Sequence, residues 1–234
     1  MAMNLQLPVK QDLRVSGDLV VHSVFDTIQG EGPFAGRPAV FVRLADCNLQ
    51  CPGCDTEYTK GKRTYNVADL IDLVERTNKG PAAGKLVVIT GGEPLRQNIV
   101  PFVRVLKSAG YDIQIETNGT LFVPDMPWHH VTVVCSPKTG KLNRHLMPHI
   151  SALKYVLDVD SYSEEDGLPI KALDHSVGGR VARPWPDFKG TVYLQPMDCK
   201  NDVRNNINLK KCVEMCMKHG YTLQIQLHKL LGVE

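Results

Sequence analysis

Residues 86–94 read LVVITGGEP, an unbroken apolar run that ends in a polar, glycine-containing cluster. Short, continuous runs of β-branched and apolar residues are typical of strands that are buried on both faces of a parallel sheet. Runs of the same kind recur along the chain at 39–44, 112–115, 131–134, 153–157, 191–194 and 221–225. We therefore expect a sheet of buried, mainly parallel strands.

Helices are predicted in the intervals between several of these strands. Apolar residues recur at i, i+3, i+4 and i+7, the spacing of an amphipathic helix, in three segments: 67–74, 99–106 and 209–216. Asn66 and Asn98 are suited to cap helix N-termini, and Gly110 and Gly220 lie where C-terminal glycines are expected. Strands that alternate with helices predict βα units, and hence a parallel sheet or barrel.

Polar clusters follow five of the predicted strands. Their sequences are TGGEP at 90–94, ETNG at 116–119, CSPK at 135–138, LQP at 194–196 and QLHK at 226–229. In a parallel barrel the carboxyl ends of the strands share one rim, where active sites are built. Any single cluster is explained by an ordinary loop, but five together predict a functional site at this rim.

Composition places the chain among ordinary globular proteins. Of its 234 residues 43% are hydrophobic and 22% charged, as in a single substantial domain, and the net charge of +2 argues against nucleic acid or an anionic membrane as the main partner. No apolar run approaches a membrane span, and the first twenty residues lack a secretory core, so we expect a cytoplasmic protein. We expect one domain over 1–234, with the charged stretch 159–190 as a surface or lid excursion.

Three of the seven cysteines form a tight cluster, Cys47-x3-Cys51-x2-Cys54. In a reducing compartment such a cluster is more typical of a metal or catalytic site than of disulfides. The other cysteines fit simple roles in a packed core, at a strand end or in a loop: Cys135, Cys199, Cys212 and Cys216.

The spacing of the cluster favours an iron–sulfur centre with one open iron. Three thiolates from one loop suit a soft metal. A structural zinc site has four protein ligands, and no histidine lies between His22 and His129 to supply the fourth. Four cysteines would complete an ordinary 4Fe–4S cluster, whereas three leave one iron free for an outside molecule. A zinc site and three unrelated thiols stay open as alternatives.

The cysteine loop, together with Gly91–Pro94, resembles the radical S-adenosylmethionine superfamily. Further motifs make the chain similar, within it, to the 7-carboxy-7-deazaguanine synthases of queuosine biosynthesis. These motifs are IQGEG at 28–32, FVRL at 41–44, CDT at 54–56, SPK at 136–138, QP at 195–196 and HKLLG at 228–232. The resemblance implies an α/β fold, an incomplete parallel (β/α) barrel of the radical S-adenosylmethionine type.

The resemblance also implies how the cofactors are held. Cys47, Cys51 and Cys54 would ligate a 4Fe–4S cluster, whose open iron is chelated by S-adenosylmethionine. Contacts to S-adenosylmethionine are implied for Gly53, Asp55, Gly92, Glu93, Glu116, Ser136, Pro137 and Lys138. Many members of the superfamily carry an aromatic residue just before the third cysteine. Here that residue is Gly53, so side-chain stacking is excluded at this point.

The implied substrate is 6-carboxy-5,6,7,8-tetrahydropterin. Arg43 suits its carboxylate, because a guanidinium fork binds a carboxylate in a bidentate manner. The residues expected to contact the substrate are Ile28, Gln29, Gly30, Glu31, Arg43, Thr90, Gln195, His228 and Glu234. Thr56, together with substrate oxygens, would hold Mg²⁺, a hard cation that prefers oxygen ligands.

The implied activity is that of a radical lyase. It would abstract hydrogen from the substrate, contract its ring and expel ammonia, which gives 7-carboxy-7-deazaguanine. An external one-electron reductant, flavodoxin-like or ferredoxin-like, and a homodimeric assembly are further expectations. The alternatives are a glycyl-radical enzyme activase and a zinc-stabilised binding protein without catalysis.

Overall fold

The computed structural model describes residues 4–14, 17–79, 85–173 and 179–233. One nine-stranded sheet, in the order β3-β1-β2-β4-β5-β6-β7-β8-β9, forms its centre. The sheet ends in two edge strands, β3 and β9, so the barrel is incomplete. The α/β barrel class expected from the sequence is therefore confirmed.

The parallel part of the sheet matches the apolar runs of the sequence. Its strands are β2 (Pro38–Leu44), β4 (Leu86–Gly91), β5 (Asp112–Thr117), β6 (Val131–Cys135), β7 (Ile150–Leu157), β8 (Thr191–Pro196) and β9 (Thr222–Leu223). Each pairs in parallel with the next. The last strand is shorter than expected, because only two residues of 221–225 join the ladder.

The other edge of the sheet is antiparallel, which the sequence analysis did not anticipate. β1 (Leu19–Ile28) pairs antiparallel with β2 and with the short β3 (Arg63–Tyr65). Much of β1 is only half-buried, so its sequence LVVHSVFDTI lacks the continuous apolar run of the inner strands. The cysteine loop consequently follows the second strand of the chain, not the first.

The four α-helices are α1 (Val67–Thr77), α2 (Val100–Ser108), α3 (Asp202–His219) and the short α4 (Leu227–Leu231) among the described residues. The Asn66 side chain accepts from Asp69 N and caps α1 as predicted. Ile99, rather than Asn98, is the N-cap of α2. Gly220 ends α3 in the left-handed conformation, with φ at 75°.

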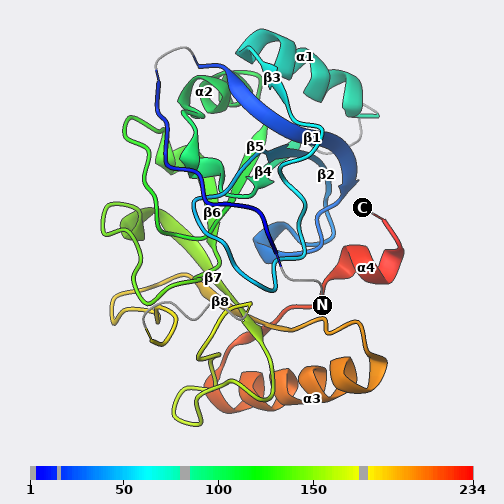
Figure 1. The fold of residues 1–234 in the computed structure, drawn as a ribbon, viewed down its shortest axis with the longest axis vertical. Coiled ribbons are helices and arrows are strands. Elements are labelled where there is room, and N and C mark those ends of the chain that lie inside the picture. Colours follow the sequence, from blue (N-terminus) through cyan, green and yellow to red (C-terminus); the bar gives the residue numbers. More distant parts are fainter. Residues whose placement is uncertain (1–3, 15–16, 80–84, 174–178, 234) are drawn as a thin grey trace.

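The helices cover different parts of the sheet (Figure 1). α1 and α2 lie side by side at the end that contains β1 and β4, whereas α3 covers the end formed by β8 and β9. Single turns of 3-10 helix replace α-helices after β5 and β6, namely η3 (Trp128–His130) and η4 (Met147–His149).

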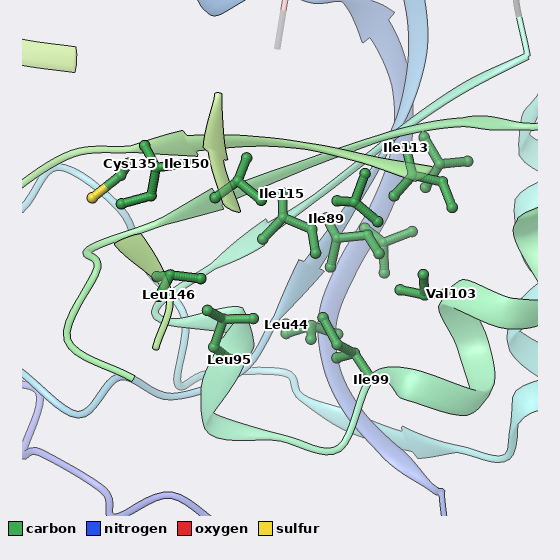
Figure 2. Close-up of a cluster of buried hydrophobic side chains, with 14 of the residues drawn as sticks. Leu44, Ile89, Leu95, Ile99, Val103, Ile113, Ile115, Cys135, Leu146 and Ile150 are labelled. Atoms are coloured by element: carbon green, nitrogen blue, oxygen red, sulfur yellow. The ribbon is translucent and has the colours of Figure 1, made fainter. Parts of the chain in front are cut away.

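The core lies between α2 and the concave arrangement of inner strands. Figure 2 shows Ile89, Ile113 and Ile115 of β4 and β5 facing Leu95 and Ile99, which precede α2, and Val103 of α2 itself. All of these side chains are buried, and Cys212 of α3 is fully buried as well. No helix in the described ranges is long and apolar enough to cross a bilayer.

The described part of 159–190 packs against the rest of the domain. Leu168 and Val181 are buried, and Arg183 Nε donates to Asp166 Oδ2 over 2.7 Å. The carbonyl of Leu173 accepts from Gly53 N at 2.9 Å, so this stretch reaches the cysteine loop. That 159–190 acts as a lid stays a prediction.

Candidate active site

The cysteine loop begins directly after β2 and is held from outside by the N-terminal segment. Cys47 and Cys51 are buried, and Cys54 is half-buried. Asn4 Nδ2 donates to the Cys51 carbonyl at 3.1 Å, and Val9 N donates to the Cys47 carbonyl at 2.7 Å. The loop thus lies between β2 and an extended strap, residues 4–9.

Burial disfavours the charged, thiolate form of the three cysteines. Burial raises the pKa of Cys47 to about 12 and that of Cys51 to about 11, and it also raises the pKa of Cys54. Because only the thiolate binds metal, a bound centre must offset this cost of ionisation.

The three cysteines of the loop supply a soft donor set. Among the described residues, no three His, Cys, Asp or Glu side chains are arranged to hold a single metal ion. A zinc site needs its ligands gathered around one point. The thiolates of a 4Fe–4S cluster instead bind separate irons. The soft donor set of this loop therefore fits the cluster.

Two glycines allow the end of β4 to pack directly on the backbone that leads into the cysteine loop. A Cβ atom on Gly91 would lie 2.1 Å from the Leu44 carbonyl oxygen, and one on Gly92 would lie 2.3 Å from the Asp46 carbonyl oxygen. Gly91 also has φ at 141°, a conformation that side chains disfavour. No other residue fits at these positions without moving the loop.

Glu93 ties together the ends of β4 and β5. Its carboxylate accepts from Thr117 Oγ1 at 2.7 Å, Asn118 N at 2.7 Å and Leu95 N at 3.0 Å. Burial raises the pKa of Glu93 to about 7, although these hydrogen bonds oppose the shift. The side chain is fully buried and lies beside the rim rather than in the cavity described next.

A cavity of about 410 Å³ opens at the carboxyl ends of the parallel strands. It brings together most of the residues that the sequence analysis singled out: Ile28, Gln29, Glu31, Arg43, Gly53, Asp55, Thr56, Thr90, Glu116, Lys138, Gln195 and His228. Outside its lining are Gly30, Gly92, Glu93, Ser136 and Pro137. Glu234 lies outside the described residues.

Glu116 is the centre of a hydrogen-bond network in this cavity. Its Oε1 accepts from Gln29 Nε2 at 2.9 Å and from Gln114 Nε2 at 3.1 Å, and its Oε2 accepts from Thr90 Oγ1 at 3.4 Å. Loop 29–31, β4 and β5 are thereby linked at one carboxylate.

Other polar atoms of the cavity have no protein partner. Arg43 Nε and Gln195 Oε1 are both buried without a hydrogen bond, and the Arg43 guanidinium lies over the Phe25 ring at 5.2 Å. An unsatisfied buried polar group costs free energy. A bound ligand with complementary groups would satisfy both atoms.

Comparison with known proteins identifies the family. The model of the Radical SAM superfamily matches residues 42–127. The 7-carboxy-7-deazaguanine synthase of Rhodospirillum rubrum is 39% identical over 222 residues, which cover 92% of each chain. That of Rickettsia prowazekii is 38% identical over 232 residues, covering 94% of this chain and 92% of the relative.

The chain belongs to the 7-carboxy-7-deazaguanine synthase family. The crystal structure of QueE from Escherichia coli agrees with this assignment, with a TM-score of 0.67 at 26% identity over 89% of this chain and 94% of that one. As a radical S-adenosylmethionine enzyme, a member of this family uses a 4Fe–4S cluster and S-adenosylmethionine. The cysteine loop fits the cluster, and the glycines at the end of β4 bring that strand close to the loop.

The C-terminal segment of this family member closes the cavity over loop 29–31. A Cβ atom on Gly30 would lie 2.2 Å from His228 Nδ1, so only glycine fits beneath the histidine. Gly32 N donates to Gln224 Oε1 at 2.6 Å, and Val233 joins the lining. The tail therefore borders the cavity as far as residue 233, and its contact with substrate stays a prediction.

Two of the lining residues that the sequence analysis did not single out contact Glu31. Lys154 of β7 forms an ion pair with Glu31, and Gln226 Nε2 donates to Glu31 Oε1 at 3.0 Å. A signal for Lys154 was present, because it is a lone cation in the apolar run LKYVL, as Arg43 is in AVFVRL. Gln226 has no comparable signal, since its role depends on how the tail folds back.

Proposed function

We propose that this chain converts 6-carboxy-5,6,7,8-tetrahydropterin into 7-carboxy-7-deazaguanine with loss of ammonia. The observation that carries the proposal is the cavity itself. It is lined by a half-buried arginine, Arg43, whose Nε has no hydrogen-bond partner, and by a buried carboxylate, Glu31. A carboxypterin presents a carboxylate for the first and N–H groups for the second. The cavity volume also falls within the roughly 300–1,000 Å³ typical of small-molecule sites, which favours a small substrate over the protein substrate of an activase.

Each residue of the proposed substrate site has a distinct task. Arg43 binds the carboxylate through its guanidinium fork. Glu31 accepts from the N–H groups of the pterin ring, and Gln195 Oε1 accepts a further N–H. Ile28, Thr90 and His228 enclose the ring, and the C-terminal segment excludes water.

Of the proposed cofactor residues, Gly53, Asp55, Glu116 and Lys138 line the same cavity. The three cluster cysteines, Gly92, Glu93, Ser136 and Pro137 lie outside its lining. When bound, the cluster and S-adenosylmethionine supply the radical chemistry that abstracts and returns a substrate hydrogen atom. Glu116 suits ribose hydroxyls, and Lys138 suits a carboxylate. The remaining proposed contacts are Gly53, Asp55, Gly92, Glu93, Ser136 and Pro137. Glu93 acts by fixing the turn that presents Gly92, since its oxygens are engaged by protein donors.

A Mg²⁺ site at Thr56 is a further part of the proposal. Thr56 lines the cavity, and its hydroxyl donates to Asp55 Oδ1 at 3.2 Å. The hydroxyl oxygen, together with substrate oxygens, forms the hard donor set that Mg²⁺ prefers. Two expectations complete the proposal, a homodimer and a cytoplasmic enzyme supplied with electrons by a flavodoxin-like or ferredoxin-like protein.

An anaerobic assay tests the activity directly. Reconstituted protein is incubated with the carboxypterin, S-adenosylmethionine and a reductant, with and without Mg²⁺. We expect 7-carboxy-7-deazaguanine and ammonia in equal amounts. Metal analysis accompanies the assay: iron and sulfide near four per chain support the enzyme. One zinc per chain without iron, or no product from iron-loaded protein, would contradict the proposal.

A further inference from the structure

Lys154 and Glu31 form a buried ion pair whose purpose the proposed function leaves unexplained. Lys154 lies in the middle of β7, and Glu31 lies in the loop after β1. Their side chains are 11% and 10% exposed, and Lys154 Nζ contacts Glu31 Oε2. Both residues line the proposed substrate cavity. A buried ion pair seldom stabilises a protein more than apolar residues of similar volume would, so stability alone does not explain this pair.

Glu31 is held in one orientation by several contacts. Its Oε1 accepts from Gln226 Nε2 at 3.0 Å, while its Oε2 faces Lys154. Its backbone N–H donates to Gln29 Oε1 at 3.1 Å. The carboxylate therefore has a fixed direction, and its remaining lone pairs are available to a ligand.

The charges around Glu31 determine its ionisation. The charged or titratable groups that surround this pair come from every neighbouring element: Arg43 of β2, Asp55 of the cysteine loop, Glu116 of β5, Lys138 after β6, Lys154 of β7 and His228 of α4. Burial disfavours the ionised form of Glu31. The charge and hydrogen bond of Lys154, with smaller contributions from Gln226 and His228, oppose burial and lower the pKa of Glu31. Loss of Lys154 would remove the largest of these opposing effects, so the pKa would rise.

We propose that Lys154 is a positioning residue that keeps Glu31 an obligate acceptor and so sets the ring specificity of the site. An ionised carboxylate only accepts hydrogen bonds, whereas a protonated one also donates. The ionised form thus favours a ring edge with an amino group, as in a pterin, over a ring with a carbonyl there, as in a lumazine. This inference rests on the proposed function.

Equilibrium binding to the cluster- and S-adenosylmethionine-loaded enzyme, without reductant, tests the proposal. The probes are the oxidised 6-carboxypterin and 6-carboxylumazine, which differ at that one ring position. We expect wild type to prefer the pterin by at least about tenfold, independently of pH between about 5.5 and 7.5. In Lys154→Met the preference should fall toward one at low pH and rise with pH, because loss of the cation raises the pKa of Glu31.

Matched variants separate this role from a merely structural one. Lys154→Arg keeps the cation and should keep the preference. Glu31→Gln should lose it, and adding Lys154→Met to Glu31→Gln should change the ratio no further. Lys211→Met removes a Lys–Glu pair on the exposed side of α3, with Nζ–Oε2 at 2.6 Å, and should behave as wild type. If Lys154→Met fails to load its cluster, Lys154→Gln provides the same comparison.

The possible failures are distinguishable. A Lys154→Met enzyme with the wild-type ratio and no pH dependence would overturn the role of Lys154 while leaving the proposed function intact. A wild-type enzyme that binds neither probe would overturn the proposed function, and this inference with it.

Discussion

The buried polar side chains of this site differ in whether the protein itself satisfies their hydrogen bonds. Arg43 and Gln195 each retain a buried polar atom without a partner, at a free-energy cost that only ligand binding repays. Glu93, in contrast, accepts hydrogen bonds from three protein donors, and these bonds fix the backbone at the ends of β4 and β5. A glutamate thus lines the cavity at position 31, whereas the glutamate at position 93 fixes the backbone beside it.

Arg43→Lys should raise the KM for the carboxypterin by about 10- to 100-fold, because lysine keeps the charge but loses the bidentate fork. Cleavage of S-adenosylmethionine in the absence of substrate should change little. Steady-state kinetics together with an uncoupled-cleavage assay measure the two effects. An unaltered KM would remove Arg43 from the substrate site.

Replacing Cys47, Cys51 or Cys54 by Ala should abolish the absorbance of the 4Fe–4S cluster. Cys212→Ala is the control, since this buried thiol packs in the core and its loss should cost only about 1 kcal/mol of stability. Visible absorption and thermal unfolding measure both outcomes. Loss of the cluster in Cys212→Ala with retention in Cys54→Ala would show that the ligands are assigned wrongly.

At the scale of elements, the site depends on the junction between β2, β4 and the cysteine loop. The end of β4 touches the β2 backbone through glycines, so the rim and the cluster loop form one rigid unit. This close approach explains why the TGGEP sequence has two glycines where an ordinary turn needs one.

Gly91→Ala should therefore destabilise the protein severely and prevent stable cluster loading. The added methyl group meets the Leu44 carbonyl oxygen, and the backbone cannot withdraw without breaking the β2–β4 ladder. Gly36→Ala is the matched control, because Gly36 also has a positive φ, at 89°, but open space around it. We expect a cost of about 1 kcal/mol for the control, from backbone strain alone. Equal unfolding temperatures for the two variants would contradict this explanation.

The inner strands could be predicted from sequence because each is buried on both faces and reads as a continuous apolar run. β1 could not, since it alternates between buried and half-buried positions and pairs antiparallel at the edge. Motif residues such as Arg43 and Glu31 were found by resemblance. Lys154 and Gln226 were not, because their roles arise from contacts between segments more than 100 residues apart along the chain.

At the scale of the whole molecule, the two ends of the chain hold the two halves of the site. Residues 4–9 cover the cysteine loop, and residues 224–233 cover loop 29–31. The barrel strands and the C-terminal segment line the cavity, whereas residues 4–9 contact the cysteine loop. Residues 4–9 and 224–233 are each held in place by hydrogen bonds to the site.

Deleting residues 232–234 should weaken binding of the carboxypterin and leave the iron content unchanged, because Val233 lines the cavity, whereas the cysteine loop is held by Asn4 and Val9. Deleting residues 1–9 should do the reverse and lower cluster retention first. Iron analysis and probe binding on both truncated proteins measure the two effects. Identical losses in both proteins would show that the termini act only on global stability.

The order of these segments along the chain has a consequence for the synthesis of the protein on the ribosome. The cysteine loop and the strap of residues 4–9 are synthesised well before Gln226 and His228, which lie much further along the chain. The nascent chain therefore carries its metal-binding segment long before it has a substrate pocket. A chain truncated by a late stop codon would retain the cysteine loop but lack the C-terminal residues that line the cavity.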